Sequence, residues 1–417
     1  DQALLSGSEG KAKQIAMKIM LRLAELQGAK EFIDVSSAHI DGCIYLGDAS
    51  VLFPKKLADE GGRVVVPTTL NAISVDREQW KIYTLDETFA EQASQAAFQY
   101  ERMGAKPTFS CTPYQLPNAP KFGQHIAWAA SNAVVYANSV IGAKTNRYGD
   151  FMDICAALTG RAPLSGYHLE ENRKGNVLIK LPKFKSVDSL LYPLLGYLIG
   201  EKVQNGVPVI EGLDHEPTSD NLKAFGAAIA TTGAIGMFHI VGITPEAPTV
   251  KEAFGNKKPE KIIEISIEEV ESLRRKLSTD NQQTVKMVLL GSPQFSLAEF
   301  ETLAHLVEGK TCHPNVKMII TTNRHMYEEA QKRGFVSGIK KFCANFVIDS
   351  CLCMIEPFIR FELHNKSGAI MTNSGKFAHY GPGLTGDDGV YIASLADCVQ
   401  SAISGETKIS VPEWSYN

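Results

Sequence analysis

Residues 285–290 read VKMVLL, a short apolar run that is interrupted only by Lys286. Such a run, bounded by polar residues, is typical of a strand that is buried in a parallel sheet. Similar runs follow at 316–320 and 346–351, and amphipathic segments with helical spacing lie between them. This alternation predicts a doubly wound α/β domain over residues 262–417.

Local signals mark where two helices of this domain begin. Ser266 precedes Glu269 by three residues, and Ser296 precedes Glu299 in the same way. This spacing is a capping-box signature, in which a hydroxyl and a carboxylate bind free N–H groups at a helix start. We therefore expect one helix after Ser266 and another after Ser296.

The amino-terminal half alternates in the same manner. Helices are expected over 11–29, 86–103 and 125–145, and strands over 33–35, 63–67, 176–181 and 207–210. The fold class is therefore α/β, with several domains in α/β/α layers and mostly parallel sheets.

A polar, Lys- and Glu-rich stretch at 245–261 is the predicted linker between two domains. It separates a first α/β region over 1–244, which carries Cys43 and Cys111, from the domain over 262–417, which carries Cys351.

Composition narrows the class of protein. The chain has 417 residues, 44% of them apolar and 21% charged, which is ordinary for a soluble globular protein. A net charge of −4 offers no basic surface for nucleic acid.

Residues 224–244 lack charged side chains, but their Gly, Ala and Thr content and His239 favour a buried helix and strand over a membrane span. Eight cysteines in so long a chain favour reduced thiols and a cytoplasmic location.

Three thiols follow strand-like segments. Cys43 ends the run HIDGC, Cys111 follows Thr108-Phe109-Ser110, and Cys351 follows Val347-Ile348-Asp349-Ser350. Strand ends of an α/β protein converge on one crevice, so the three thiols suggest a soft-metal or iron–sulfur site. Cys353 is a reserve ligand, provided that the chain bends after Cys351. The alternative is that all eight cysteines are small buried hydrophobic residues.

Polar clusters suggest a site for an anion. Residues 372–376 read TNSGK and combine amide, hydroxyl and ammonium groups, as a cradle for a carboxylate or phosphate would, although a solvated turn has the same composition. Arg147 could bind a carboxylate through both guanidinium nitrogens or could form a surface ion pair. His39 is a candidate ligand, an acid or base, or a core residue.

Several blocks together resemble the large, catalytic part of the aconitase X family. The resemblance runs from about Ser36 to Gly383 and is closest to the bacterial cis-3-hydroxy-L-proline dehydratases. The blocks are SSAHIDG at 36–42, CTPY at 111–114, AKTNRYG at 143–149, GYHL at 166–169 and TNSGKFAHY at 372–380.

This resemblance implies an aconitase-like fold and a hydro-lyase that removes water from a small hydroxy acid at an iron centre. The expected reaction converts cis-3-hydroxy-L-proline to Δ1-pyrroline-2-carboxylate. Family members also have a small swivelling domain, fused or separate, which supplies a serine base. We expect that domain to lie outside this chain and to be its partner, with no nucleic acid or membrane partner.

The resemblance also implies roles for individual residues. The predicted metal ligands are Cys43, Cys111 and Cys351, on an iron–sulfur cluster of the 2Fe–2S type, with mononuclear iron or a 4Fe–4S cluster as alternatives. The predicted catalytic residues are Ser37, His39 and Lys376. The predicted substrate-binding residues are Ser36, Thr69, Asn146, Arg147, Thr372, Asn373 and Ser374.

Two other functions stay open from the sequence. Archaeal members of the family dehydrate phosphomevalonate, and that branch tends to carry Cys and His where this chain has Ser292 and Gln294. Those two departures, together with Cys43, favour hydroxyproline. The second possibility is a metal-free large subunit that binds a partner and does not catalyse.

Overall fold

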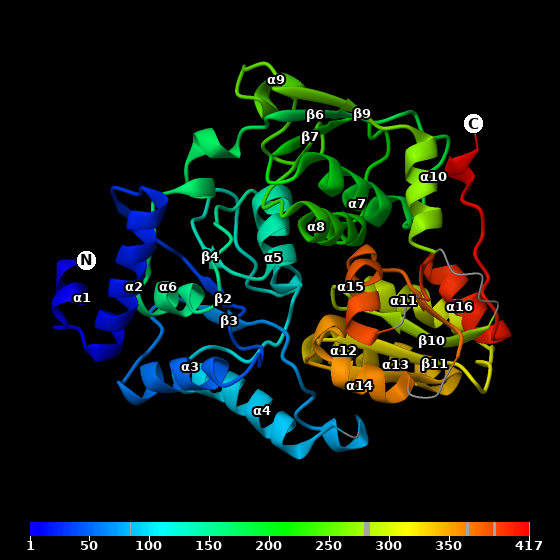
Figure 1. The fold of residues 1–417 in the computed structure, drawn as a ribbon, viewed down its shortest axis with the longest axis horizontal. Helices are drawn as coiled ribbons and strands as arrows, with labels where there is room; N and C mark the ends of the chain where they lie inside the picture. The colour runs from blue at the N-terminus through cyan, green and yellow to red at the C-terminus, as the bar shows by residue number, and fades with distance from the viewer. Residues whose placement is uncertain (84, 279–283, 364–366, 387–388, 417) are drawn as a thin grey trace.

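The computed structural model describes residues 1–83, 85–278, 284–363, 367–386 and 389–416. The chain forms three regions around a common centre, and each contains one main parallel sheet (Figure 1). Among the described residues, no helix is both long and apolar enough to cross a bilayer.

The first region has a parallel sheet of order β3-β2-β4 and a separate antiparallel pair, β1–β5. Its elements are α1 (Gln2–Ser6), α2 (Lys11–Gln27), β1 (Phe32–Asp34), β2 (Ala38–Ile40), α3 (Ala49–Asp59), β3 (Thr68–Leu70), η1 (Trp80–Tyr83), α4 (Glu87–Arg102), η2 (Pro113–Gln115), β4 (Ala127–Trp128), α5 (Ser131–Tyr136), η3 (Ala137–Ile141), α6 (Met152–Thr159), β5 (Arg161–Pro163), η4 (Gly166–His168) and η5 (Glu170–Arg173).

The second region has a four-stranded parallel sheet of order β8-β7-β6-β9. Its elements are β6 (Val177–Lys180), α7 (Leu191–Val203), β7 (Pro208–Glu211), α8 (Ser219–Gly233), β8 (His239–Ile240), α9 (Val250–Ala253), β9 (Lys261–Glu264) and α10 (Ile267–Lys276). Helices α7 and α8 pack closely because Gly196 faces the carbonyl of Phe225, where a Cβ would collide.

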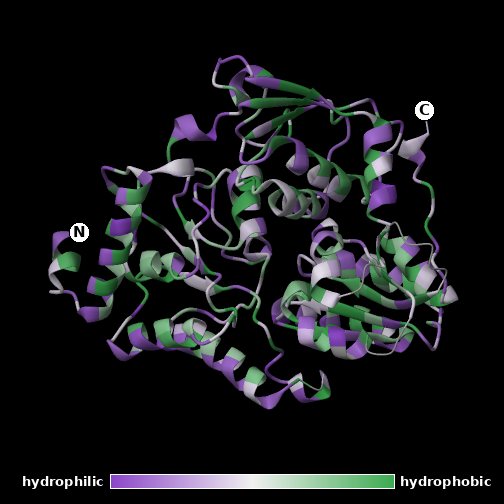
Figure 2. Cartoon of the chain, in the orientation of Figure 1, coloured by the Kyte–Doolittle hydropathy of each residue, from purple (hydrophilic) through white to green (hydrophobic). Residues whose placement is uncertain are grey.

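The third region is a five-stranded parallel sheet of order β12-β11-β10-β13-β14. Its elements are β10 (Val285–Leu290), α11 (Leu297–Val307), β11 (Lys317–Thr322), α12 (Arg324–Lys332), α13 (Phe335–Phe342), β12 (Ala344–Ile348), η6 (Leu352–Met354), α14 (Glu356–Leu363), β13 (Ala369–Thr372), α15 (Gly375–Thr385), β14 (Val390–Ile392), α16 (Leu395–Ser404) and η7 (Glu413–Ser415). Its strands are apolar and its helices carry polar outer faces (Figure 2). The predicted doubly wound sheet and both capping boxes are confirmed.

The predicted linker at 245–261 needs correction. It contains α9, and the strand that follows it, β9, pairs in parallel with β6. A boundary at 245–261 would therefore remove β9 from its own sheet. The strand pairing instead favours a boundary after α10, which polar composition alone did not reveal.

Two element predictions were wrong in detail. The strand expected at 63–67 begins only at Thr68, where β3 pairs with β2. The helix expected over 125–145 is divided into β4, α5 and η3, because residues 127–128 join the sheet and Gly142 takes a left-handed conformation. By contrast, residues 224–244 form part of α8 followed by β8, as expected.

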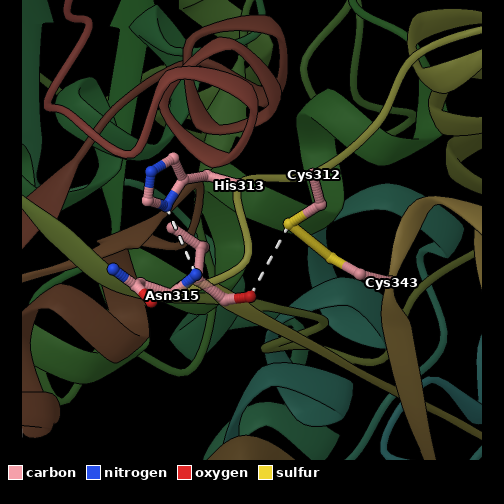
Figure 3. The surroundings of a disulfide bond; sticks show 5 residues. Cys312, His313, Asn315 and Cys343 are labelled. Carbon is pink, nitrogen blue, oxygen red and sulfur yellow. Dashed lines mark hydrogen bonds between the residues drawn. A yellow bond between two sulfur atoms is a disulfide. The ribbon is translucent and has the colours of Figure 1, made fainter.

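One pair of cysteines departs from the expectation of reduced thiols. Cys312, in the loop before β11, forms a disulfide with Cys343 at the end of α13, with the two Cα atoms 6.0 Å apart (Figure 3). That separation lies within the usual range for disulfides, and the two residues are far apart in sequence, so spacing could not reveal the pair. The other six cysteines are free.

Candidate active site

The order of strands in the third region determines where a site can form. β10 lies between β11 and β13, so the loops after β10 and β13 leave the sheet in opposite directions. In doubly wound sheets, ligands bind in the crevice at this point. The loop after β10 begins at Gly291, whose φ of 98° and close approach to Thr321 both require glycine. The loop after β13 leads into α15, whose second residue is Lys376.

Two predicted thiols meet beside this crevice. Cys111 comes from the first region and Cys351 follows the end of β12, and both belong to one small buried cluster with Ala72. Interactions of Cys111 and Cys353 with Cys351 are strong enough to shift the pKa values of all three thiols. Cys353 can face the same cavity because the chain bends into η6 directly after Cys351. The structure therefore brings three thiols together.

The third region supplies a hydroxyl to this cluster of thiols. Ser292 Oγ lies 3.7 Å from the sulfur of Cys351 and 3.6 Å from that of Cys353. Ser292 is held in turn, because the hydroxyl of Ser374 donates to its carbonyl oxygen. The loops after β10 and β13 are thus joined next to the sulfur atoms.

These thiols open onto a cavity of about 290 Å³ between the first and third regions. Its polar and ionisable lining residues are Asp41, Asn71, Cys111, Ser131, Asn132, Cys351, Cys353, Lys376 and Tyr380, and its apolar lining residues are Ile44, Ala72, Ala130, Met354 and Leu384. The volume suits a small organic acid rather than a cofactor of nucleotide size.

Lys376 and the thiols that line the cavity shift one another's pKa values. Burial would lower the pKa of Lys376, but the thiols of Cys353, Cys351 and Cys111 outweigh it and raise that pKa above its ordinary value. Interactions with Cys111 and Cys353 lower the pKa of Cys351, and Lys376 adds to that effect. The lowered pKa of Cys351 and the raised pKa of Lys376 favour the charged form of each group, which suits binding of a metal ion or an anion.

A buried carboxyl group faces the same cavity. Burial, followed by the charge of Asp150, raises the pKa of Asp41 to about 6, while Asn71 and Lys376 act in the opposite sense. The amide of Asn71 donates a hydrogen bond to a carboxylate oxygen of Asp41. Above pH 6 the cavity therefore contains one carboxylate and one ammonium group on its walls.

Cys43, a predicted ligand, does not line this cavity. Its thiol lies within 3.4 Å of the carbonyl oxygens of Ile40 and Asn71, inside the core of the first region. The chain reverses after β2, so that Asp41 and Ile44 face the cavity while Cys43 points inward. Cys353 lines the cavity together with Cys111 and Cys351.

The predicted catalytic residues lie apart, with one exception. Lys376 lines the cavity. His39 is fully buried beside Trp128, with Nδ1 2.8 Å from Thr69 Oγ1, and burial lowers its pKa to about 3. Ser37 and Thr69 line a different cavity, between β3 and the start of α12. His39 is therefore a neutral core residue in this structure.

Three predicted substrate-binding residues make structural contacts away from the thiol cavity. The hydroxyl of Ser36 donates to the carbonyl of His125 at 3.1 Å. The side chain of Asn146 donates to Ser165 O at 3.0 Å and accepts from Tyr167 N at 2.8 Å. The guanidinium of Arg147 donates to the carbonyl of Ala234. None of the three lines the thiol cavity as the structure describes it.

Residues 372–376 lead from β13 into the start of α15, and their hydroxyl groups bind backbone N–H groups there. Ser374 caps α15 by accepting a hydrogen bond from Phe377 N at 3.0 Å, and Thr372 accepts one from Ser374 N at 3.2 Å. Asn373 faces two other cavities, near α8 and α11. Only Lys376 of this predicted cluster lines the thiol cavity.

Several residues that line the thiol cavity were not among the predicted site residues. Asp41 and Asn71 follow β2 and β3, so the rule that placed thiols at strand ends could have found both. Asn132 carried no such signal, because residues 125–145 read as one helix. Its amide donates to the carbonyl of Cys111 at 2.7 Å, a contact between segments that only folding brings together.

The donor set fits a cofactor that is held by thiolates. Soft sulfur ligands select zinc, copper(I) or iron–sulfur centres, and Cys111, Cys351 and Cys353 offer three at one wall of a cavity. Among the described residues, no three His, Cys, Asp or Glu side chains are already arranged to hold a single metal ion. The chemistry of the three thiols fits a soft metal ion or an iron–sulfur centre.

Comparisons with known proteins agree with this geometry. Family models described as the first, second and third domains of aconitase X match residues 1–171, 175–275 and 285–404. The chain belongs to the aconitase X family. The three aconitase X domains correspond to the three sheet-based regions, with a boundary after α10.

Curated aconitase X relatives fall into two groups. A cis-3-hydroxy-L-proline dehydratase of Pseudomonas aeruginosa is 46% identical over 99% of this chain and 71% of its own length. One from Hypocrea jecorina is 46% identical over 99% of this chain and 69% of its own length. The phosphomevalonate dehydratase large subunit of Methanocaldococcus jannaschii is 36% identical over 92% of this chain and 94% of its own length. The named relatives in both groups are dehydratases.

A solved aconitase X structure confirms the fold class. The holo-form of aconitase X from Thermococcus kodakaraensis superimposes with a TM-score of 0.85 at 32% identity. The match covers 96% of this chain and 98% of that one. The aconitase-like α/β architecture that we expected is therefore shown.

Proposed function

We propose that this protein is a hydro-lyase that removes water from cis-3-hydroxy-L-proline to yield Δ1-pyrroline-2-carboxylate. The observation that supports it best is the charge pattern of the thiol cavity. Among the described residues that line it, Lys376 is the one cation and Asp41 the one carboxylic acid. A zwitterionic amino acid complements that pair, with its carboxylate toward Lys376 and its ammonium toward Asp41.

The same pattern disfavours a phosphorylated substrate. A phosphate carries close to two negative charges and is usually bound by several cationic or N–H groups. The described lining offers a single lysine, and the ionised Asp41 would repel a second anion. The higher identity to hydroxyproline dehydratases than to phosphomevalonate dehydratases supports the same choice.

We further propose an iron–sulfur cofactor held by Cys111, Cys351 and Cys353, of the 2Fe–2S type. When bound, it supplies a Lewis acid that assists departure of the substrate hydroxyl. The three thiols at one wall of the cavity support this assignment. A cluster of this kind requires reduced thiols, which favours a cytoplasmic location.

The side chains of the cavity would orient the substrate. Lys376 neutralises the carboxylate, and this makes the adjacent α-proton easier to remove. Asp41 fixes the ring nitrogen. Burial around the thiols excludes water and strengthens both charge interactions.

We propose that the base that takes the α-proton comes from a small swivelling domain or subunit. The archaeal relatives are named large subunits, which supports a division of the enzyme into two parts. The exposed mouth of the cavity, where Tyr380 is 42% exposed, suits closure by such a partner.

The test is an anaerobic assay of the chain together with its small domain or subunit. We expect turnover of cis-3-hydroxy-L-proline and none of mevalonate 5-phosphate. The reverse preference would overturn the substrate. Protein without iron and without either activity would instead support a binding subunit that does not catalyse.

A further inference from the structure

A fully buried glutamine links the two loops that carry the thiols. Gln294 follows β10, and its side chain donates from Nε2 to the carbonyls of Phe109 at 3.1 Å and Ser350 at 2.8 Å. Its Oε1 accepts from the backbone N–H of Cys111 at 3.1 Å. One amide group thus spans the residues before Cys111 and before Cys351.

The backbone of the same residue also contacts a thiol. The N–H of Gln294 donates to the sulfur of Cys111, with a nitrogen–sulfur distance of 3.3 Å. Hydrogen bonds of this kind stabilise negative charge on a thiolate. Gln294 therefore both holds the loop of Cys111 and acts on its sulfur.

A buried ion pair holds Gln294 from the other side. Lys223 of α8 donates to the carbonyl of Gln294 at 3.3 Å. The ammonium of Lys223 is itself paired with Asp220 at 2.9 Å and with Glu299 of α11. All three regions of the chain therefore meet at this residue, since Phe109, Lys223 and Ser350 belong to different ones.

We propose that Gln294 is a positioning residue, which holds the sulfur atoms of Cys111 and Cys351 at the separation that the cofactor requires. The inference rests on the proposed thiol-held cofactor and is independent of the choice of substrate. The hydrogen bonds of Gln294 are formed in the apoprotein, so they would hold the two thiols in place before the cofactor binds.

The chemistry of the contacts explains why this residue is an amide. Two carbonyl oxygens and one N–H surround the side chain, so it must donate twice and accept once. Glutamate has the same shape and can still accept from Cys111 N–H, but its carboxylate would face the carbonyls of Phe109 and Ser350 without a proton to donate. Methionine has a similar length and forms none of the three bonds.

The test measures binding of Co²⁺ by the full-length apoprotein under anaerobic conditions. Thiolate ligation gives a sulfur-to-cobalt charge-transfer absorption, whose intensity per bound ion reports the number of thiolates. For Gln294→Glu we expect the Kd for Co²⁺ to rise about 10- to 100-fold and the charge-transfer intensity to fall, as is usual when groups that orient metal ligands are removed.

The matched control is Gln99→Glu, because Gln99 is also a buried glutamine whose amide hydrogen-bonds other residues, Gln95 and Arg102, within α4. We expect its Co²⁺ affinity and spectrum to equal those of the wild type. Unchanged affinity and spectrum in Gln294→Glu would overturn the proposal, whatever its stability or activity.

A second variant covers the case in which Gln294→Glu does not fold. Gln294→Met introduces no buried charge and is expected to show the same loss of affinity with a native circular dichroism spectrum. A wild-type protein that binds Co²⁺ without any charge-transfer band would refute the proposed cofactor site itself, an outcome distinct from unaltered binding by the Gln294 variants.

Discussion

Cys111 of the first region and Cys351, which follows β12, belong to one buried cluster, and the interaction of the two thiols raises the pKa of Cys111 and lowers that of Cys351. Each is nearly fully buried, and each lines the same cavity. The site therefore exists only when the first and third regions are packed together.

The ligand set can be tested by replacing one cysteine at a time. We expect Cys111→Ser, Cys351→Ser and Cys353→Ser each to lower the iron content of anaerobically purified protein at least several-fold, because serine is a poor ligand for iron–sulfur clusters. Iron and sulfide analysis checks this.

The corresponding control variants are Cys43→Ser and Cys398→Ser, which alter buried thiols outside the cavity. Both should retain iron. Loss of iron from Cys43→Ser, together with retention in Cys353→Ser, would restore Cys43 as the third ligand.

Replacing Lys376 should weaken every ligand that carries a carboxylate. A charged hydrogen bond contributes about 1.5–3 kcal/mol, so Lys376→Met should lower affinity for L-proline and for cyclopentanecarboxylate roughly 10- to 100-fold. Calorimetry of both ligands measures the effect. Equal affinities in variant and wild type would show that the carboxylate binds elsewhere.

Replacing Asp41 should distinguish the two ligands. In Asp41→Asn we expect affinity for L-proline to fall about tenfold or more, because its ammonium loses a charged partner. Cyclopentanecarboxylate has no nitrogen, so its affinity should stay the same or rise. Asp59→Asn is the control, since Asp59 is a surface carboxylate of α3 that does not line the cavity. A parallel loss for both ligands would argue against the ammonium contact.

The buried ion pairs of Lys223 predict a large effect on stability. Lys223 is 2% exposed, and Lys223→Met would leave Asp220 and Glu299 without their cation. We expect the free energy of unfolding to fall by about 3–5 kcal/mol, as measured by chemical denaturation. Lys332→Met removes an exposed pair with Glu329 and should have no measurable effect. Similar midpoints for the two variants would contradict this expectation.

Asp153 predicts a pH dependence of stability. Burial raises its pKa from an ordinary 3.8 to about 7, although the N–H groups of Asp41, Ile154 and Gly42 oppose the shift. The folded state therefore favours the protonated acid, and its contribution to stability is complete below pH 3.8 and is lost as pH rises through about 7.

Asp153→Asn should remove this dependence. The unfolding free energy of the wild type, relative to the variant, should fall between pH 4 and pH 8. Parallel pH profiles for the two proteins would show that Asp153 titrates normally.

Short-range patterns predicted much of the fold. The apolar runs of β10 and β12 and the capping boxes at Ser266 and Ser296 depend on residues within a few positions of one another. These patterns are short-range, so they can be recognised without knowing which distant residues pack against them. The predicted helix at 125–145 failed for the converse reason, since pairing of β4 with the distant β2 outweighed its helical composition.

Which side chains line the cavity depends on packing between residues that are far apart in the sequence. Cys43 and Cys353 carry the same functional group, and their positions in sequence gave no reason to prefer Cys353. The reversal after β2 turns Cys43 into the core, while the bend into η6 turns Cys353 toward Cys351. A side chain can take either direction at a strand end, and the packing of the three regions decides which thiols face the cavity.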